Sequence, residues 1–464
     1  MKTLLILPCL LFANNIFSQV AINTDGSLPN PAAMLHVDVG SSTTKGFLVT
    51  GTANSGTVPN FLPGSRLMFF PGKSAFRVGH TITSEWDDFN VGQYSMAMGY
   101  GPRAVGNSST ALGYFSYARA DYSTAIGNQA DARGVNSMAL GYATVAGADY
   151  ATTMGNATFA FGVNSTAMGY NTSAGGDYST AMGNSSNASG FASTAMGNYS
   201  FAGGKYSMAM GNNSNANGMA STAMGDYSSA NGVYSTAMGE FTIANGESST
   251  SMGNLTIANG FASTAMGSRT TAGGNYSVAI GSKVEATQEG SFFFADSDPY
   301  NKGVRGISAA NQIAMRFNGG YYFITDNSGA TDKGVFMGAG ANSWSAISDI
   351  RLKENFVPVN GEDFLQKISQ IPLTTWNYKG QNVKTFRHYG PMAQDFYAAF
   401  GHDKLGTIGC DTLINQQDFL GVNLIAIQAL EKRTEMISEL KKTIDDQNKK
   451  IDMLIKRIEA LEKK

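Results

Sequence analysis

Residues 179–197 read STAMGNSSNASGFASTAMG and contain one complete period of a repeat. The closing glycine recurs every 14 residues without a gap, so thirteen intervals separate fourteen glycines. A fixed period is the sequence signature of a solenoid, in which each repeat forms one coil stacked on the next. We therefore predict a solenoid. The closing glycines are Gly99, Gly113, Gly127, Gly141, Gly155, Gly169, Gly183, Gly197, Gly211, Gly225, Gly239, Gly253, Gly267 and Gly281.

Each period has a second, weaker half, which predicts two short strands and two turns per coil. Alternation along a strand places Ser193 and Ala195 on one face and Met196 on the other. Ala202 gives the second strand a small face as well. Two strands of seven residues would enclose a very thin interior that only Ala, Ser and Gly fit, so the small faces should point inward.

The residue before each closing glycine is apolar in all fourteen repeats. Stacked coils would align these side chains in one apolar column on the outside of the roll. An exposed stripe of this length is typical of an association surface. We expect the rolls to associate through this column, about a common axis. Its members are Met98, Leu112, Ile126, Leu140, Met154, Met168, Met182, Met196, Met210, Met224, Met238, Met252, Met266 and Ile280.

Composition excludes several classes of function. The net charge of −2 does not suggest a nucleic-acid partner. Carboxylates and basic groups do not recur in register along the repeats, so we expect no catalysis in the rod. The four histidines are scattered without Cys or carboxylate partners at metal-ligand spacing, and we predict neither a metal nor a cofactor. They are His36, His80, His388 and His402.

Residues 1–18 combine a lysine, an apolar run and a final serine, which matches a secretory signal cleaved before Gln19. The alternative is a retained membrane anchor, although the run is short for a bilayer span. Removal of the signal would leave Cys410 as the only thiol and exclude an intrachain disulfide. We therefore expect the protein to be exported and held together by packing or assembly.

The apolar spacing changes to heptads from Asn423, which predicts a coiled coil over residues 423–464. Ile at one core position with Leu at the other favours two parallel strands. The alternative is an amphipathic helix packed on its own domain. Leu430, Ile437, Ile444, Ile451 and Ile458 occupy one core position, and Leu440, Gln447, Leu454 and Leu461 occupy the other.

The SxAxG pattern at 14-residue spacing resembles the head of YadA-like trimeric autotransporter adhesins. This resemblance implies a mainly β fold, a left-handed parallel β-roll that assembles as a homotrimer and presents a surface-exposed binding rod. It favours three chains over the two that the heptads favour. Those adhesins end in a membrane barrel anchor, whereas this chain ends in a helix, so we expect no transmembrane anchor in the mature chain.

Three further motifs, SDIRLKENF (348–356), RHYGPMAQDF (387–396) and LGVNLIAIQALE (420–431), resemble the intramolecular chaperone domain of endosialidase tailspikes. The resemblance implies an α+β domain that trimerises, helps the preceding stalk to fold and then cuts itself off. The scissile bond would be Ile347–Ser348, with Ser348 as nucleophile and Lys353 as its partner. This serine peptidase activity would be a single turnover.

A Ser/Lys dyad needs no other group, because a lysine whose pKa is lowered from about 10.4 can take the serine proton. A spacing of five on a regular helix would separate the side chains by about 140°, so a bend or pairing between subunits is required. The alternative is that Asp349 caps a helix and Lys353 lies on a solvated face. The second motif adds His388, Gly390 and Gln394 as candidate supporting residues, with a structural hydrogen bond as the alternative for the histidine.

These observations predict a secreted or cell-surface fibre that pairs with itself and binds an unidentified host or matrix ligand. One alternative is an uncut structural fibre with a permanent trimerisation stalk, and another is a phage-type tail fibre. The residues between the roll and residue 348 could also form a compact globular domain. The predicted parts are a signal (1–18), a capping or attachment region (19–91), the β-roll head (92–286), a β neck (287–347) and the chaperone domain (348–464).

Overall fold

The computed structural model describes residues 20–23, 28, 32–38, 40, 46–60, 62–297, 305–326 and 333–463. The predicted signal lies outside the described residues. The chain divides into two units, Met1–Asn318 and Gly319–Lys464, and each is described by itself.

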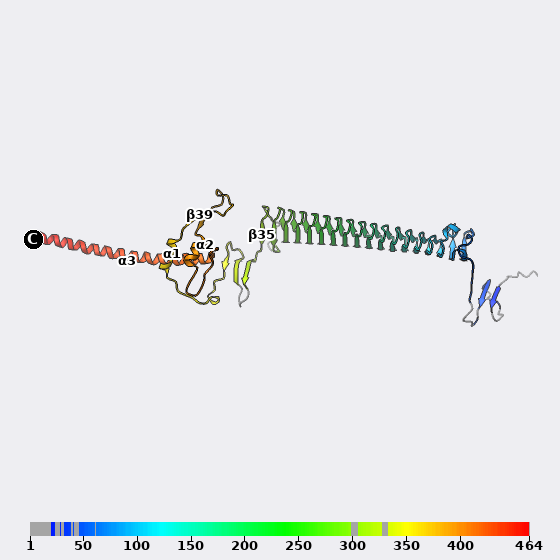
Figure 1. Cartoon of the computed structure of the whole chain (residues 1–464), viewed down its shortest axis with the longest axis horizontal. Helices are drawn as coiled ribbons and strands as arrows, with labels where there is room; N and C mark the ends of the chain where they lie inside the picture. Colours follow the sequence, from blue (N-terminus) through cyan, green and yellow to red (C-terminus); the bar gives the residue numbers. More distant parts are fainter. Residues whose placement is uncertain are drawn as a thin grey trace, which may run out of the picture. The chain divides into compact units, whose positions relative to one another are not determined.

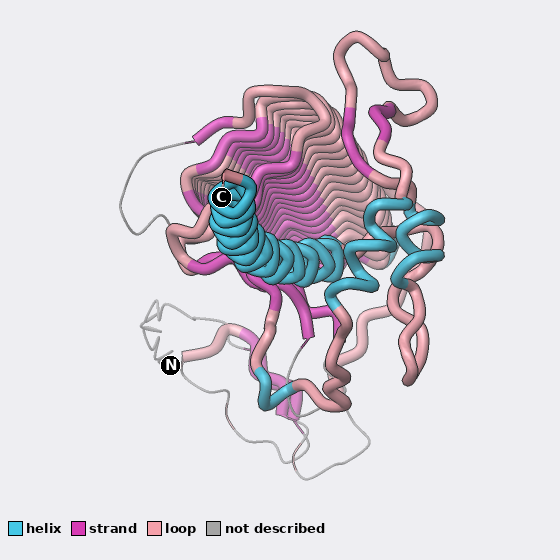
Figure 2. Tube along the Cα trace, turned by 90° about the vertical axis from the view of Figure 1, so that its left-hand side faces the viewer, coloured by secondary structure: helices cyan, strands magenta, loops and turns pink. Residues whose placement is uncertain are grey.

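The first unit is dominated by a β-solenoid of stacked two-strand coils (Figures 1 and 2). Long strands pair in parallel with long strands, and short strands with short strands, each shifted by one period. The long strands are β5 (Met96–Tyr100), β7 (Thr110–Tyr114), β9 (Thr124–Asn128), β11 (Met138–Tyr142), β13 (Thr152–Asn156), β15 (Thr166–Tyr170), β17 (Thr180–Asn184), β19 (Thr194–Asn198), β21 (Met208–Asn212), β23 (Thr222–Asp226), β25 (Thr236–Glu240), β27 (Thr250–Asn254), β29 (Thr264–Ser268) and β31 (Val278–Ser282).

The second sheet is built from strands of two residues, or three in the last of them. The short strands are β6 (Arg103–Ala104), β8 (Tyr117–Ala118), β10 (Asp131–Ala132), β12 (Val145–Ala146), β14 (Phe159–Ala160), β16 (Ser173–Ala174), β18 (Asn187–Ala188), β20 (Phe201–Ala202), β22 (Asn215–Ala216), β24 (Ser229–Ala230), β26 (Ile243–Ala244), β28 (Ile257–Ala258), β30 (Thr271–Ala272) and β32 (Val284–Ala286).

Strand length differs from the expectation of two seven-residue strands per coil. Each coil has one strand of five residues and one of two, as in β19 and β20. The other residues form two corners, where Ala192 (φ 50°) and Tyr199 (φ 52°) adopt the left-handed conformation. A residue in that conformation cannot continue a strand, so the corners take residues that the alternation alone would assign to strands.

The interior of the solenoid is as thin as predicted. Ala195 and Ala202 from the two strands of one coil are completely buried, and Ser193 is buried beside them. The hydroxyl of Ser200 donates to the carbonyl oxygens of Met196 and Gly211, each at 2.9 Å. Small side chains therefore fill the core, and this serine hydroxyl pairs within the coils rather than with water.

The apolar column lies on the outer face of the long-strand sheet. Met196 pairs in register with Met182 and Met210, and the same pairing continues through the stack. Met98 is 37% exposed and Met154 is 41% exposed, while most other members are half-buried. The column is thus a continuous apolar surface of the single chain.

The stack extends on both sides of the fourteen repeats. β4 (Ala75–Thr81) pairs in parallel with β5, and β3 (Gly64–Phe70) pairs antiparallel with β4. At the other end, β33 (Phe292–Ala295) and β35 (Ile313–Arg316) continue the long-strand sheet, and β34 (Arg305–Gly306) continues the short one. The backbone pairing therefore passes beyond the residues that carry the SxAxG signature.

Arg77 lies inside the first coil, in register with Ala97, and is completely buried. Its guanidinium donates to the carbonyl oxygens of Ser95 and Ala104 and to the Ser95 hydroxyl. Burial lowers the pKa of this guanidinium to about 10. The guanidinium occupies the interior at the point where the regular repeats begin and satisfies carbonyl groups there.

Shorter elements complete the described part of the first unit. They are β1 (Val20–Asn23) and β2 (Leu35–Asp38), which pair in parallel, and the 3₁₀ helices η1 (Pro71–Lys73) and η2 (Asp88–Asn90).

The second unit combines small antiparallel sheets with three α-helices and one 3₁₀ turn among its described residues. One sheet contains β36 (Gly320–Asp326), β37 (Lys333–Gly338) and β38 (Ser345–Ala346), and the other contains β39 (Thr374–Trp376) and β40 (His388–Gly390). The helices are the 3₁₀ turn η3 (Ile350–Leu352), α1 (Gly361–Gln370), α2 (Ala393–Phe400) and α3 (Gln416–Glu462).

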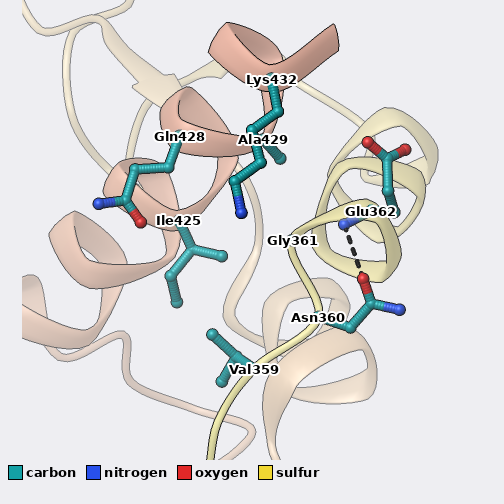
Figure 3. Close-up of a pocket in the computed structure, with 8 residues that line it drawn as sticks. All are labelled: Val359, Asn360, Gly361, Glu362, Ile425, Gln428, Ala429 and Lys432. Atoms are coloured by element: carbon teal, nitrogen blue, oxygen red, sulfur yellow. Dashed lines mark hydrogen bonds between the residues drawn. The ribbon is translucent and has the colours of Figure 1, made fainter. Parts of the chain in front are cut away.

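The start of α1 packs against α3 (Figure 3). Asn360 caps α1 by accepting a hydrogen bond from the Glu362 amide, and Glu362 is ion-paired with Arg433 of α3. A Cβ atom on Gly361 would lie 2.8 Å from the Cβ of Ala429, so glycine permits the close approach.

α3 is one continuous helix of 47 residues (Figure 1). It begins at Gln416, seven residues before the predicted start of the coiled coil. Every described residue from Leu430 to Lys463 is exposed in the single chain, including the heptad residues Ile437 and Ile444. The apolar stripe therefore has no partner within this chain's described residues. No helix in the described part is long and apolar enough to cross a membrane.

The closing glycines permit a backbone approach that other residues would block. Gly197 has φ 119°, and a Cβ atom there would lie 2.1 Å from the carbonyl oxygen of Gly211. We predict that Gly197→Ala destabilises the rod by about 1–3 kcal/mol, the usual scale of local backbone strain. Urea unfolding followed by circular dichroism, with hydrogen exchange at the β19 and β21 amides, measures the effect.

Gly175→Ala is the matched control, because a Cβ atom there would meet nothing closer than 3.8 Å and the backbone is not left-handed. Equal stability of the two variants would contradict the role assigned to the closing glycine.

Candidate functional site

The two residues of the predicted dyad lie together in one chain. The Lys353 ammonium donates a hydrogen bond of 2.7 Å to the Ser348 hydroxyl oxygen. Both side chains are exposed, and Ser348 lies two residues after the end of β38. The distance is short enough for direct proton transfer between the two groups.

A tight turn supplies the bend that Ser348 and Lys353, five residues apart, require in order to meet. η3 occupies the three residues Ile350–Leu352, and Lys353 already has extended backbone, with φ −121° and ψ 149°. The chain therefore turns once and leaves the helix before the lysine. This geometry brings Lys353 back to Ser348 within one chain, without a partner subunit.

Asp349 caps this turn, in agreement with the sequence interpretation. Its carboxylate accepts a hydrogen bond of 2.9 Å from the Arg351 amide and pairs with the Arg351 guanidinium. The side-chain hydrogen bond from Arg351 lowers the pKa of Asp349 below its ordinary value. The carboxylate is therefore charged at neutral pH and loses its contacts only when the pH falls through that lowered pKa.

A pocket adjoins the dyad. Ile347 and Asp349, on either side of Ser348, line it together with Lys353, and β36, β37 and the start of α3 close it. Lys333, one of these lining residues, is paired with Asp326 at 2.6 Å. Among the described residues, no group of three His, Cys, Asp or Glu side chains could hold a metal ion. The dyad itself places a hydroxyl beside an amine.

Two known protein families match segments of this chain. The YadA head domain repeat matches segments from residue 104 to residue 283, and the chaperone of endosialidase matches residues 348–403. The chain joins YadA-like head repeats to an endosialidase-type chaperone segment. The two matches agree with the two resemblances found in the sequence and with the order of those segments along the chain. No curated protein matches the chain.

The chaperone match begins at Ser348, so the predicted scissile bond lies at its edge. The match ends at residue 403 and therefore does not include α3, while the repeat match ends at residue 283, before β33. Neither family model matches the residues between 283 and 348, although β33 and β35 continue the solenoid there.

The candidate supporting residues of the chaperone segment lie elsewhere. His388 and Gly390 are in β40, and Gln394 is in α2; none of them lines the pocket beside Lys353. The His388 ring stacks on Trp376 with centroids 4.6 Å apart. In the single chain this histidine joins a packed aromatic group, and its buried Nε2 has no hydrogen-bond partner among the described residues.

Lys333, Asn415 and Gln417 line the pocket, and the sequence analysis did not single them out. Asn415 caps α3, with its side chain accepting hydrogen bonds from Gln417 and Asp418. An Asn before a helical pattern is a recognisable start signal and would have located this cap. No local pattern marks Lys333, because only the folded chain brings β37 to this pocket.

We predict that Asp349→Ala slows cutting of the Ile347–Ser348 bond roughly fivefold, the scale of one lost helix cap, because the turn that places Lys353 is loosened. The fraction of cut chain against time, read from denaturing gels after expression is stopped, measures the rate. Glu354→Ala removes an exposed carboxylate that does not cap η3 and should leave the rate unchanged. Equal rates in both variants would show that the cap does not position the lysine.

Proposed function

We propose that this chain is a secreted or cell-surface, homotrimeric, adhesin-like fibre whose C-terminal domain guides trimer folding and then releases itself at Ile347–Ser348. The observation that carries this proposal is the 2.7 Å contact between Lys353 and Ser348, at the first residue of the chaperone match. The YadA-like repeats support the fibre, and the chaperone family supports a role in trimer assembly.

Two exposed apolar surfaces support the trimer. One is the column on the long-strand sheet, and the other is the heptad stripe of α3, in which Ile437 is 53% exposed and Ile444 is 52% exposed. Such surfaces are typically covered by association. Three chains agree with the resemblance of the repeats to trimeric adhesin heads. Gln447, at a core position of the heptads, weakens their preference for two strands.

A trimerising tail has a physical purpose in this fibre. Identical coils can pair with the wrong coil of a neighbouring chain, and each wrong register resembles the right one. Pairing between distant parts of several chains is also slow and exposes apolar surface to aggregation. A coiled coil that forms early aligns the three chains and fixes the register before the rods associate.

The proposed cut uses atoms of one chain and one water molecule. With its amine neutral, Lys353 takes the proton from the Ser348 hydroxyl, and the oxygen attacks the Ile347 carbonyl carbon. The C–N bond breaks, the Ser348 nitrogen receives the proton and leaves as an amine, and an ester joins Ile347 to the serine oxygen. Water then hydrolyses this ester to give a carboxylate at Ile347 and the free hydroxyl of Ser348.

We expect the unmutated protein to yield a C-terminal fragment of about 13 kDa, the mass of the 117 residues 348–464. Ser348→Ala and Lys353→Ala should each abolish it, because one removes the nucleophile and the other the base. Ser345→Ala, three residues earlier, is the control and should cut normally. Denaturing electrophoresis measures all four proteins. A full-length band alone in the unmutated protein would favour the uncut stalk.

We expect Ile444→Glu to reduce trimer yield at least tenfold, because it places three carboxylates in the apolar core of the proposed coiled coil. Lys442→Glu changes an outward heptad position of the same helix and should leave the trimer intact. Sedimentation of the purified proteins measures the mass. A trimer of unchanged stability in Ile444→Glu would show that α3 does not assemble through this stripe.

A further inference from the structure

A hollow on the short-strand face of the rod departs from the regular repeats. It lies over β8, β10, β12 and β14, where Tyr117, Asp131, Val145 and Phe159 occupy the same register in four successive coils. This sheet faces away from the apolar column, which lies on the outside of the long-strand sheet. Association through the column therefore leaves the hollow open.

The sizes of the stacked side chains create the hollow. Tyr117 and Phe115 form one wall and Phe159 forms the other, while Ala143 and Val145 form a low floor between them. Three coil spacings separate Tyr117 from Phe159, or about 14 Å at a typical strand spacing. One or two sugar rings fit in that width.

Charge is concentrated on one side of the floor. Asp131 is only 6% exposed and is held by two guanidiniums, from Arg119 at 2.6 Å and from Arg133 at 2.8 Å. Arg119 also lies over the Tyr117 ring, 5.2 Å from its centroid. Two cations face one carboxylate, so the cluster keeps a net positive charge.

The ion pairs with Asp131 leave N–H groups of Arg133 available to a ligand. Arg133 contacts Asp131 through its Nε, and its side chain is about half exposed. Its terminal N–H groups make no hydrogen bond to the described residues. The buried carboxylate thus fixes the orientation of the guanidinium while part of its planar fork remains open to a second anion.

This combination does not recur along the rod. In the same register as Asp131, the coils from Val145 to Thr271 carry only uncharged residues, such as Ser173, Asn187 and Ile243. Between Gly99 and Gly281 the chain has five cationic residues, of which three are in the first coils. The cluster is therefore a local feature and not a property of the repeat.

We propose that this hollow binds a saccharide that carries a carboxylate. Phe159 offers an aromatic ring to a sugar, Tyr117 holds Arg119 through a cation–π contact, and Arg133 offers a fork to the carboxylate. A few convergent polar groups within an apolar hollow are the usual composition of a ligand site. This inference rests on the proposed role of the rod as a binding surface and names the class of ligand.

Titration calorimetry of the full-length protein tests this with two tetrasaccharides. One is the hyaluronan tetrasaccharide, which alternates glucuronate with N-acetylglucosamine, and the other is chitotetraose, its neutral counterpart. We expect binding of the first and at least tenfold weaker binding of the second. Arg133→Gln and Tyr117→Ala should each weaken hyaluronan tetrasaccharide binding at least tenfold.

Matched controls separate the hollow from the rod as a whole. Arg269→Gln removes an exposed cation from a distant coil, and Phe201→Ala removes an aromatic ring at the register of Tyr117. Both should bind like the unmutated protein, and circular dichroism should show all four variants folded. Equal binding of the two saccharides, or equal loss in controls and test variants, would overturn the assignment. If the trimer binds the matrix but neither saccharide, only this inference is contradicted. If the trimer binds no surface at all, the proposed adhesin role is contradicted as well.

Discussion

The close stacking of one coil on the next is the constraint on which the rest of this molecule depends. Glycine at positions such as Gly197 lets the backbone approach the following coil, and alanine at positions such as Ala195 and Ala202 lets the two sheets approach each other. A solenoid so thin buries little apolar surface per residue. Its larger side chains, the methionine column among them, remain outside. The rod is therefore built in a way that leaves an association surface.

That surface explains why a chaperone segment is useful here. Fourteen nearly identical coils offer many wrong registers between chains, and the rod itself has few features that distinguish one register from another. Two further distinguishing features lie outside the regular repeats: Arg77 fills the coil that precedes them, and α3 of the second unit presents its heptads. In the proposed trimer, the chaperone segment has no further role once the three rods have associated, and the proposed cut at Ile347–Ser348 would separate it from the fibre.

The repeats made most of the first unit predictable, because period and alternation together fix which side chains point inward. The strand lengths were not predictable, since nothing in the alternation marks Ala192 and Tyr199 as left-handed corners. The continuation of the stack was also missed. Phe293 takes the register of Ala279, so the backbone pairing persists although the small-residue signature has ended.

The dyad could be inferred from its motif, but its geometry could not. Two side chains five residues apart point in different directions on a regular helix. The short turn capped by Asp349 is what brings Ser348 and Lys353 together. The pocket beside it depends on β37 and on the start of α3, which are far apart in the sequence. The same limit applies to the hollow at Asp131, where the contact with Arg119 and Arg133 depends on the register of neighbouring coils.

Intact-mass spectrometry of the C-terminal fragment tests the central claim most directly, because it locates the cut to a single bond. The account predicts a fragment that begins at Ser348 with a free amine, together with an N-terminal product that ends in the Ile347 carboxylate. A fragment that begins at any other residue, or a chain that stays uncut after the trimer has formed, would contradict it.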